Sequence, residues 1–218
     1  MSAKLLVHLT LCILSTMEEL IREWLSTGSI NIFGKPFAGK DTQGKILADL
    51  LDGVVLSGGD ILRNSTIPNH VQETMRSGKL VPTEEYINIV LPYLAQDHFA
   101  HQPLILSSVG RWHGEEAGVL QATEQAGHPV KAVIYLNLED DTVRQRWHNL
   151  KDTNDRGDRH DDTLEVLEVR LQEYHEKTLP VIDYYRKKGL LIEIDGHQNP
   201  EIVHQTILTA LTDTLARQ

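Results

Sequence analysis

The feature that most constrains this chain is a glycine-rich segment at residues 34–42, GKPFAGKDT. It fits the pattern G-x-x-x-x-G-K followed by two polar residues. The apolar run 29–33 before it is typical of a buried strand, and residues 42–51 after it have a helical pattern. A loop in this position binds phosphate, because its backbone N–H groups and the helix N-terminus face the anion. The predicted phosphate-binding residues are Gly34, Ala38, Gly39, Lys40, Asp41 and Thr42, with Lys40 bridging β- and γ-phosphate oxygens.

Apolar runs and helical patterns then alternate along the rest of the chain. This rhythm predicts an α/β fold of the P-loop NTPase type, with a five-stranded parallel sheet between two helical layers. The expected strands are residues 29–33, 53–57, 102–107, 131–138 and 190–194.

Composition excludes several functional classes. The 218 residues carry a formal net charge of -10, which disfavours nucleic-acid binding, since that needs a basic face. Cys12 is the single cysteine, so no intrachain disulfide or Cys-rich zinc site is expected and a reducing cytoplasm is the predicted location. The apolar run 5–14 is too short to span a bilayer, so no membrane association is expected.

The N-terminal region has two interpretations. Residues 1–16 are either a genuine extension or an artefact of the start site, because Met17 is an alternative start. An amphipathic helix is expected after Met17, within residues 1–28. The main domain is then expected to cover residues 29–218.

Several motifs in the same order resemble those of the adenylate kinase and nucleoside monophosphate kinase family. The loop reads GKPFAGKDTQ, residues 57–63 read SGGDILR, and residues 78–82 read GKLVP. Residues 159–162 read RHDD, similar to the R-x-D-D of the family's lid. The resemblance implies a helical segment for the acceptor nucleotide at about 57–88 and a short lid at about 151–162.

The resemblance also implies a reaction. It is transfer of the γ-phosphoryl group of ATP to a nucleoside monophosphate, with AMP as the expected acceptor (ATP and AMP giving two ADP) and Mg²⁺ as cofactor, in a protein expected to be a monomer. The implied catalytic residues are Lys40, Arg111, Arg159 and Arg170. Arg146 would lie near the donor adenine, and the acceptor would contact Gly58, Arg63, Leu80, Val81, Ser108, Arg111 and Glu115.

Two departures from the family pattern concern the metal. The strand that ends at residue 107 carries Ser107 where the family has an acidic residue, and Asp41 follows the loop lysine where the family usually has glycine. We hypothesise that Asp41 has taken over part of the magnesium-binding role. The alternative is that Asp41 only favours the start of its helix.

Further departures concern the base and the loop. Glu115 stands where the family's adenine-reading glutamine is expected, and Gly58 replaces a threonine. A carboxylate only accepts hydrogen bonds, which suits guanine better than adenine. GMP or another monophosphate is therefore an alternative to AMP, unless Glu115 merely begins its helix. Phe37 replaces a loop glycine and is expected to alter the loop's curvature. A nucleotide-binding regulator without catalysis is the non-enzymatic alternative.

Overall fold

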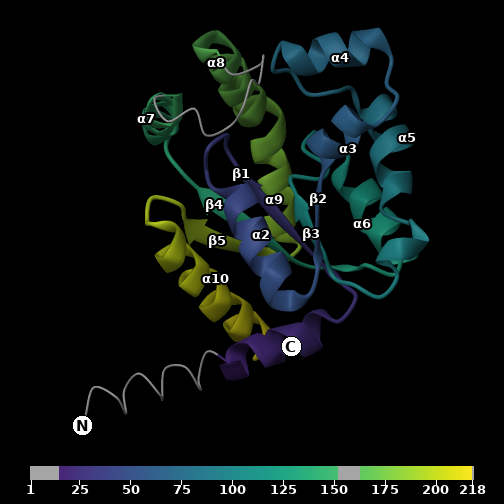
Figure 1. Cartoon of the computed structure of the whole chain (residues 1–218), viewed down its shortest axis with the longest axis vertical. Helices are drawn as coiled ribbons and strands as arrows, with labels where there is room; N and C mark the ends of the chain where they lie inside the picture. The colour runs from purple at the N-terminus through teal and green to yellow at the C-terminus, as the bar shows by residue number, and fades with distance from the viewer. Residues whose placement is uncertain (1–14, 152–162, 218) are drawn as a thin grey trace.

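The computed structural model describes residues 15–151 and 163–217. Its centre is a five-stranded sheet in the order β2-β3-β1-β4-β5, and every neighbouring pair is parallel (Figure 1). The predicted α/β fold is therefore confirmed. The strands are β1 (Ser29–Gly34), β2 (Val54–Ser57), β3 (Leu104–Ser107), β4 (Val130–Asn137) and β5 (Leu191–Asp195).

Both faces of the sheet are buried, as the apolar character of the strands predicts. Along β4, Ala132, Ile134 and Leu136 pack into one core cluster, while Val133 and Tyr135 pack into another. Successive side chains of a strand point to opposite faces. This strand therefore needs a helical layer on each side, which is the arrangement of parallel sheets in general.

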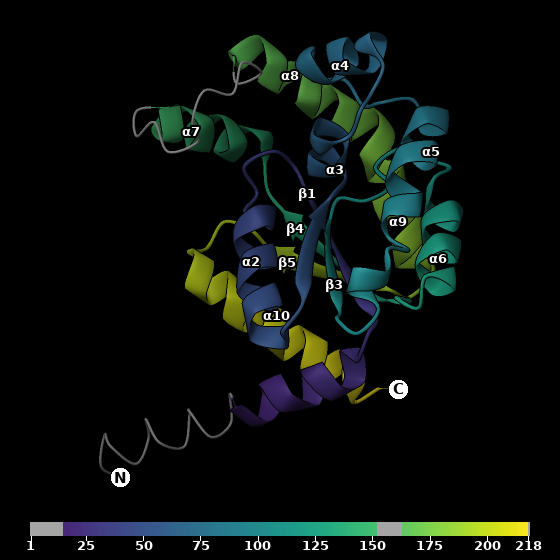
Figure 2. The ribbon, with the colours of Figure 1, turned by 45° about the vertical axis from the view of Figure 1, so that its right-hand side comes forward.

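The helices form these two layers (Figures 1 and 2). On one face, α2 (Lys40–Leu51) and α10 (Pro200–Leu215) share a core with the helix of residues 15–25. The other face and the upper edge carry the remaining helices. These are α3 (Gly58–Asn64), α4 (Asn69–Arg76), α5 (Thr83–Tyr93), η1 (Asp97–Phe99), α6 (Glu116–Gln125), α7 (Asp140–Lys151), α8 (Leu164–Glu173), η2 (Tyr174–Thr178) and α9 (Leu179–Lys187).

The long helical run through Pro180 is not a regular α-helix. Between α8 and α9, residues Tyr174–Thr178 form a π-helical turn, in which the Leu179 N–H donates to the Tyr174 carbonyl. Pro180 has no N–H and its ring crowds the carbonyl four residues earlier, so the run widens just before it. This turn places Glu173 and Thr178 beside the site described below.

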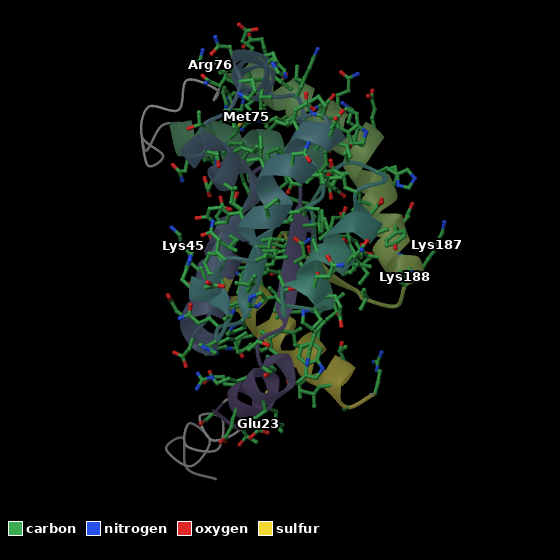
Figure 3. The ribbon with its side chains drawn as sticks, turned by 90° about the vertical axis from the view of Figure 1, so that its right-hand side faces the viewer. Glu23, Lys45, Met75, Arg76, Lys187 and Lys188 are labelled. Atoms are coloured by element: carbon green, nitrogen blue, oxygen red, sulfur yellow. The ribbon has the colours of Figure 1, made fainter. Side chains whose placement is uncertain are left out.

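Charged side chains cover the outside of the helices. Glu23, Lys45, Lys187 and Lys188 point away from the body of the protein (Figure 3). Within the described ranges, no helix combines the length and apolar character needed to cross a membrane.

The helix of residues 15–25 is part of the packed structure, because Ile21 and Leu25 are fully buried in the main core. We expect Leu25→Ala to lower the free energy of unfolding by about 2–4 kcal/mol, since it leaves a cavity. Leu20→Ala is the matched control, because Leu20 is 40% exposed and its loss should cost less than about 0.5 kcal/mol. Urea unfolding followed by circular dichroism measures both. An equal decrease in the free energy of unfolding in the two variants would contradict the placement of this helix.

Candidate active site

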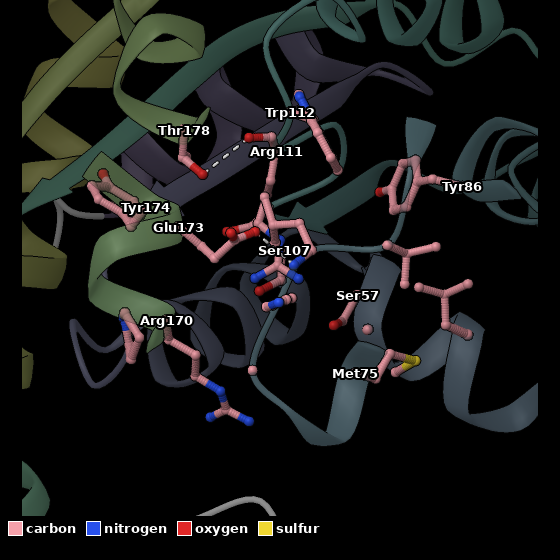
Figure 4. Close-up of a pocket in the computed structure, with 18 of the residues that line it drawn as sticks. Ser57, Met75, Tyr86, Ser107, Arg111, Trp112, Arg170, Glu173, Tyr174 and Thr178 are labelled. Atoms are coloured by element: carbon pink, nitrogen blue, oxygen red, sulfur yellow. Dashed lines mark hydrogen bonds between the residues drawn. The ribbon is translucent and has the colours of Figure 1, made fainter. Parts of the chain in front are cut away.

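A cavity of about 490 Å³ opens at the carboxyl ends of three neighbouring strands. The last residues of β1, β2 and β3, which are Gly34, Ser57 and Ser107, all line it. In parallel α/β sheets ligands bind at this edge. The remaining walls come from α3, α4, the segment 78–81, the loop after β3 and the run from α8 to η2 (Figure 4).

The glycine-rich loop forms one end of this cavity. Gly39 has a φ of 93° and is the N-cap of α2, so the loop turns sharply into the helix. Lys40 Nζ donates hydrogen bonds of 2.8 Å to the carbonyl oxygens of Gly34 and Lys35. The ammonium group therefore lies across the loop, at the start of a helix whose first N–H groups favour anions.

Phe37 takes a left-handed conformation within the same loop. Its φ is 61°, which an L-residue adopts at a cost and glycine adopts freely. Its side chain is only 8% exposed and joins the main core. Burial of the ring thus offsets backbone strain, and the loop makes its turn without a glycine at this position.

Arg146, on α7, bridges two loops. Its guanidinium donates to the Phe37 carbonyl at 3.1 Å and to the Gly196 carbonyl, after β5, at 2.6 Å. Burial lowers the pKa of this guanidinium, and the Asp195 carboxylate partly opposes that effect. Arg146 does not line the cavity, so its contact with a donor adenine stays a prediction.

A second link to the phosphate loop was not predicted. Lys35 pairs with Asp140 at the start of α7, and Asp140 Oδ2 also lies 2.9 Å from His175 Nε2 on η2. Burial opposes ionisation of Asp140, but the hydrogen bonds from Lys35 and His175 outweigh it, so the pKa of Asp140 is lowered. Since these residues are 35 or more positions apart, no local pattern indicates the cluster.

Asp41 and Ser107 lie side by side. Ser107 Oγ donates to Asp41 Oδ1 at 3.2 Å, across the gap between the first turn of α2 and the end of β3. The N-cap of α2 is Gly39, and no side chain caps this helix. The Asp41 carboxylate therefore lies next to Ser107, the position at which the resemblance implies an acidic residue.

Three arginines converge on the cavity from different elements. Arg63 lies on α3, Arg111 in the loop after β3 and Arg170 on α8, and all three line it. Burial lowers the pKa of Arg111, and repulsion by Arg170 and Arg63 lowers it further. Thr178 Oγ1 donates to the Arg111 carbonyl at 3.0 Å and holds the loop in place (Figure 4). A concentration of positive charge such as this favours a bound anion.

The segment that contains Leu80 and Val81 is anchored to the π-helical turn region. The Leu80 N–H donates to Glu173 Oε2 at 2.9 Å, and Glu173 pairs with Lys177 at 2.6 Å. Lys177 Nζ lies 4.0 Å from the ring centroid of Trp112, which also lines the cavity. Glu173 and Trp112 are thus site residues that sequence reasoning missed, and Lys177 links them.

Gly58, at the start of α3, packs against Tyr86, which lines the cavity. A Cβ atom at Gly58 would lie 2.5 Å from Tyr86 Oη, so a larger side chain would force Tyr86 to shift. Tyr86 Oη accepts a hydrogen bond from the Gly110 N–H at 3.0 Å. Ser108, with a φ of 52°, donates to the Ile32 carbonyl at 3.3 Å and lines the same wall.

Glu115 lies in this region and is 2% exposed. Its Oε2 accepts from the Trp112 N–H at 3.1 Å, and its side chain makes no cap for α6. The neighbouring Glu116, the first residue of α6, accepts at Oε2 from the Gly114 N–H at 2.7 Å, which lies before the helix. Burial raises the pKa of Glu115, against the opposing effects of the Trp112 N–H, Thr83 and Arg111.

Comparison with known proteins agrees with this geometry. The family model described as adenylate kinase matches residues 32–190, which is most of the chain. The chain belongs to the adenylate kinase family. It is 34% identical to the adenylate kinase of Prochlorococcus marinus (strain MIT 9211) over 82% of this chain and 94% of that protein. It is also 36% identical to the adenylate kinase of Cyanothece sp. (strain PCC 7425) over 77% of this chain and 86% of the relative.

This membership confirms three predictions: the family, the kinase class of the enzyme and its binding of nucleotides. Most of the predicted site residues of this adenylate kinase family member meet in the one cavity. Ala38, Gly39, Thr42, Gly58 and Arg146 do not line it, and Arg159, with the predicted lid from residue 152 onward, lies outside the described residues. Those that line it are Gly34, Lys40, Asp41, Arg63, Leu80, Val81, Ser108, Arg111, Glu115 and Arg170.

The contact between Gly58 and Tyr86 gives a stability test. Gly58→Ala should cost about 1–3 kcal/mol of unfolding free energy, because the added methyl group overlaps the hydroxyl. The cost should fall by about 0.5 kcal/mol or more in a Tyr86→Phe background, where the overlapping oxygen is gone. Urea unfolding of the two single variants and the double variant measures this coupling.

Gly59→Ala is the matched control, since its Cβ would meet only the flexible end of Arg63, at 3.3 Å. It should be nearly neutral. Strictly additive costs for Gly58→Ala and Tyr86→Phe would show that the two residues do not touch.

Proposed function

We propose that this enzyme transfers the γ-phosphoryl group of ATP to a nucleoside monophosphate, producing ADP and a nucleoside diphosphate. The observation that carries the proposal is the single cavity that joins Lys40 of the phosphate loop to Arg63, Arg111 and Arg170. The names of the relatives support AMP as the acceptor. Glu115 supports GMP or another monophosphate instead.

The roles follow from the charge distribution. Phosphoryl transfer requires positioning and positive charge around the equatorial oxygens rather than a covalent nucleophile on the protein. Lys40 would hold the β- and γ-phosphates of ATP, while Arg63 and Arg111 would hold the phosphate of the acceptor, whose oxygen attacks. Arg170 would add charge from the side of α8, and Arg159 from the lid.

The residues around Asp41 fit a magnesium ion. Mg²⁺ takes one or two carboxylates, completes its shell with waters and phosphate oxygens, and prefers hard oxygen ligands. The Asp41 carboxylate and the Ser107 hydroxyl, 3.2 Å apart, supply such oxygens beside the loop. Among the described residues, no group of three or more His, Cys, Asp or Glu could hold a metal alone. When bound there, magnesium would offset negative charge on the β- and γ-phosphates.

The regulator alternative is less well supported. A protein that only senses ATP has no need of Arg63 and Arg111, the arginines proposed for the acceptor phosphate. Action as a monomer in the cytoplasm stays a prediction.

A coupled assay of nucleoside diphosphate formation tests the enzyme. ATP, magnesium and each of AMP, GMP, CMP, UMP and dTMP are supplied separately, and we expect turnover that requires both nucleotides. Lys40→Met should lower kcat by about 100-fold or more. Lys45→Met is the control, because Lys45 is exposed on the same helix. ATP binding without turnover for any acceptor would favour the regulator.

Moving the carboxylate tests the magnesium site. Asp41→Asn should raise the magnesium concentration for half-maximal activity by about tenfold, because an amide is a weaker magnesium ligand than a carboxylate. Adding Ser107→Asp to that variant should restore the requirement toward its original value, since the two side chains occupy neighbouring points. A magnesium titration of kcat for the three proteins measures this. An unchanged magnesium requirement in Asp41→Asn would mean that Asp41 only favours the start of its helix and does not bind magnesium.

A further inference from the structure

Glu115 carries a buried oxygen whose hydrogen-bonding capacity is unused. Its Oε2 accepts from the Trp112 N–H, but Oε1 is buried and has no hydrogen-bond partner among the described residues. Thr83 lies close enough to favour the ionised carboxyl, yet gives Oε1 no hydrogen bond of normal geometry. Leaving a buried carboxylate oxygen without a donor is unfavourable. Glu115 lines the cavity, so a ligand donor that reached Oε1 would remove that penalty.

The residues around Glu115 indicate which chemical groups of a ligand could bind there. Gly110 lies between Glu115 and Tyr86. A Cβ atom at Gly110 would lie 3.7 Å from Glu115 Cβ, and the Gly110 N–H donates to Tyr86 Oη at 3.0 Å. Tyr86 Oη also fills the space in front of Gly58. Because this hydroxyl accepts from Gly110, its own proton is left to donate. The end of the cavity thus offers a carboxylate acceptor and a hydroxyl donor close to each other.

We infer that Glu115 selects an acceptor nucleotide whose base presents N–H donors on its Watson–Crick edge, as guanine does, over adenine. This inference rests on the proposed function and deepens it. Guanine has donors at N1 and N2 for the carboxylate and an acceptor at O6 for the Tyr86 hydroxyl. Adenine has an acceptor at N1, which would face the carboxylate with no proton between them.

Binding is the sharpest test, because it does not depend on turnover. The Kd values of GMP, IMP and AMP are measured by isothermal titration on the full chain. IMP keeps the N1 proton and O6 but lacks the amino group, so we expect the order GMP, IMP, AMP from tightest to weakest. Each lost donor to the carboxylate should weaken binding by about tenfold or more.

Glu115→Gln is the isosteric variant. The amide offers one donor and one acceptor, which matches adenine, so the ratio of the GMP and AMP affinities should shift toward AMP by about 100-fold. Glu116→Gln is the control, since Glu116 pairs with His113, accepts from the Gly114 N–H and does not line the cavity, and it should leave the ratio unchanged.

The outcomes separate the inference from the proposed function. Tighter AMP than GMP binding in the unaltered protein, or an unchanged ratio in Glu115→Gln, would overturn the role of Glu115 even if turnover is rapid. The expected order of affinities without turnover for any acceptor would keep the binding role and reject the kinase reaction.

Discussion

The parallel register of three strands is the constraint on which the site depends. Ser57 of β2 pairs with Ser107 of β3, and Ser107 pairs with Ile32 of β1. Since parallel strands all end at the same edge, the phosphate loop, the start of α3 and the loop with Arg111 leave the sheet side by side. A shift of one residue would turn the buried side chains of β1 to the opposite helical layer, so the core holds the register that the site requires.

Positively charged side chains are concentrated at the same edge of the sheet, and the protein must hold them in position. Arg63, Arg111 and Arg170 repel one another, and the lowered pKa of Arg111 reflects burial and that repulsion. The Lys40 ammonium group is held by hydrogen bonds to the carbonyl oxygens of Gly34 and Lys35. Thr178, on the π-helical turn, holds the backbone of Arg111. The irregular turn caused by Pro180 therefore serves the positioning of a loop from another part of the chain.

Local patterns in the sequence predict the elements and the loop well, but not the contacts between distant residues. The strand–loop–helix unit around Lys40 is recognisable because all its parts are consecutive. The contact of Lys35 with Asp140 joins residues 105 positions apart, and that of Leu80 with Glu173 joins residues 93 apart. Such contacts arise from packing, and no spacing rule indicates them. The π-helical turn was missed for a different reason, since a proline in a helical pattern also predicts a simple kink.

The departures from the family pattern at Ser107 and Gly58 share one physical explanation, and the departure at Glu115 does not. The acid absent at Ser107 has a counterpart in Asp41, whose oxygen lies 3.2 Å from Ser107 Oγ. The side chain absent at Gly58 has a counterpart in the Tyr86 hydroxyl, 2.5 Å from where a Cβ would be. In both cases a polar atom is supplied from a neighbouring element. At Glu115 an oxygen stands where an amide nitrogen is expected, and no described neighbour supplies a donor to it. A nearby polar atom thus compensates for the exchanges at Ser107 and Gly58, whereas the exchange at Glu115 leaves an acceptor for a donor on the ligand.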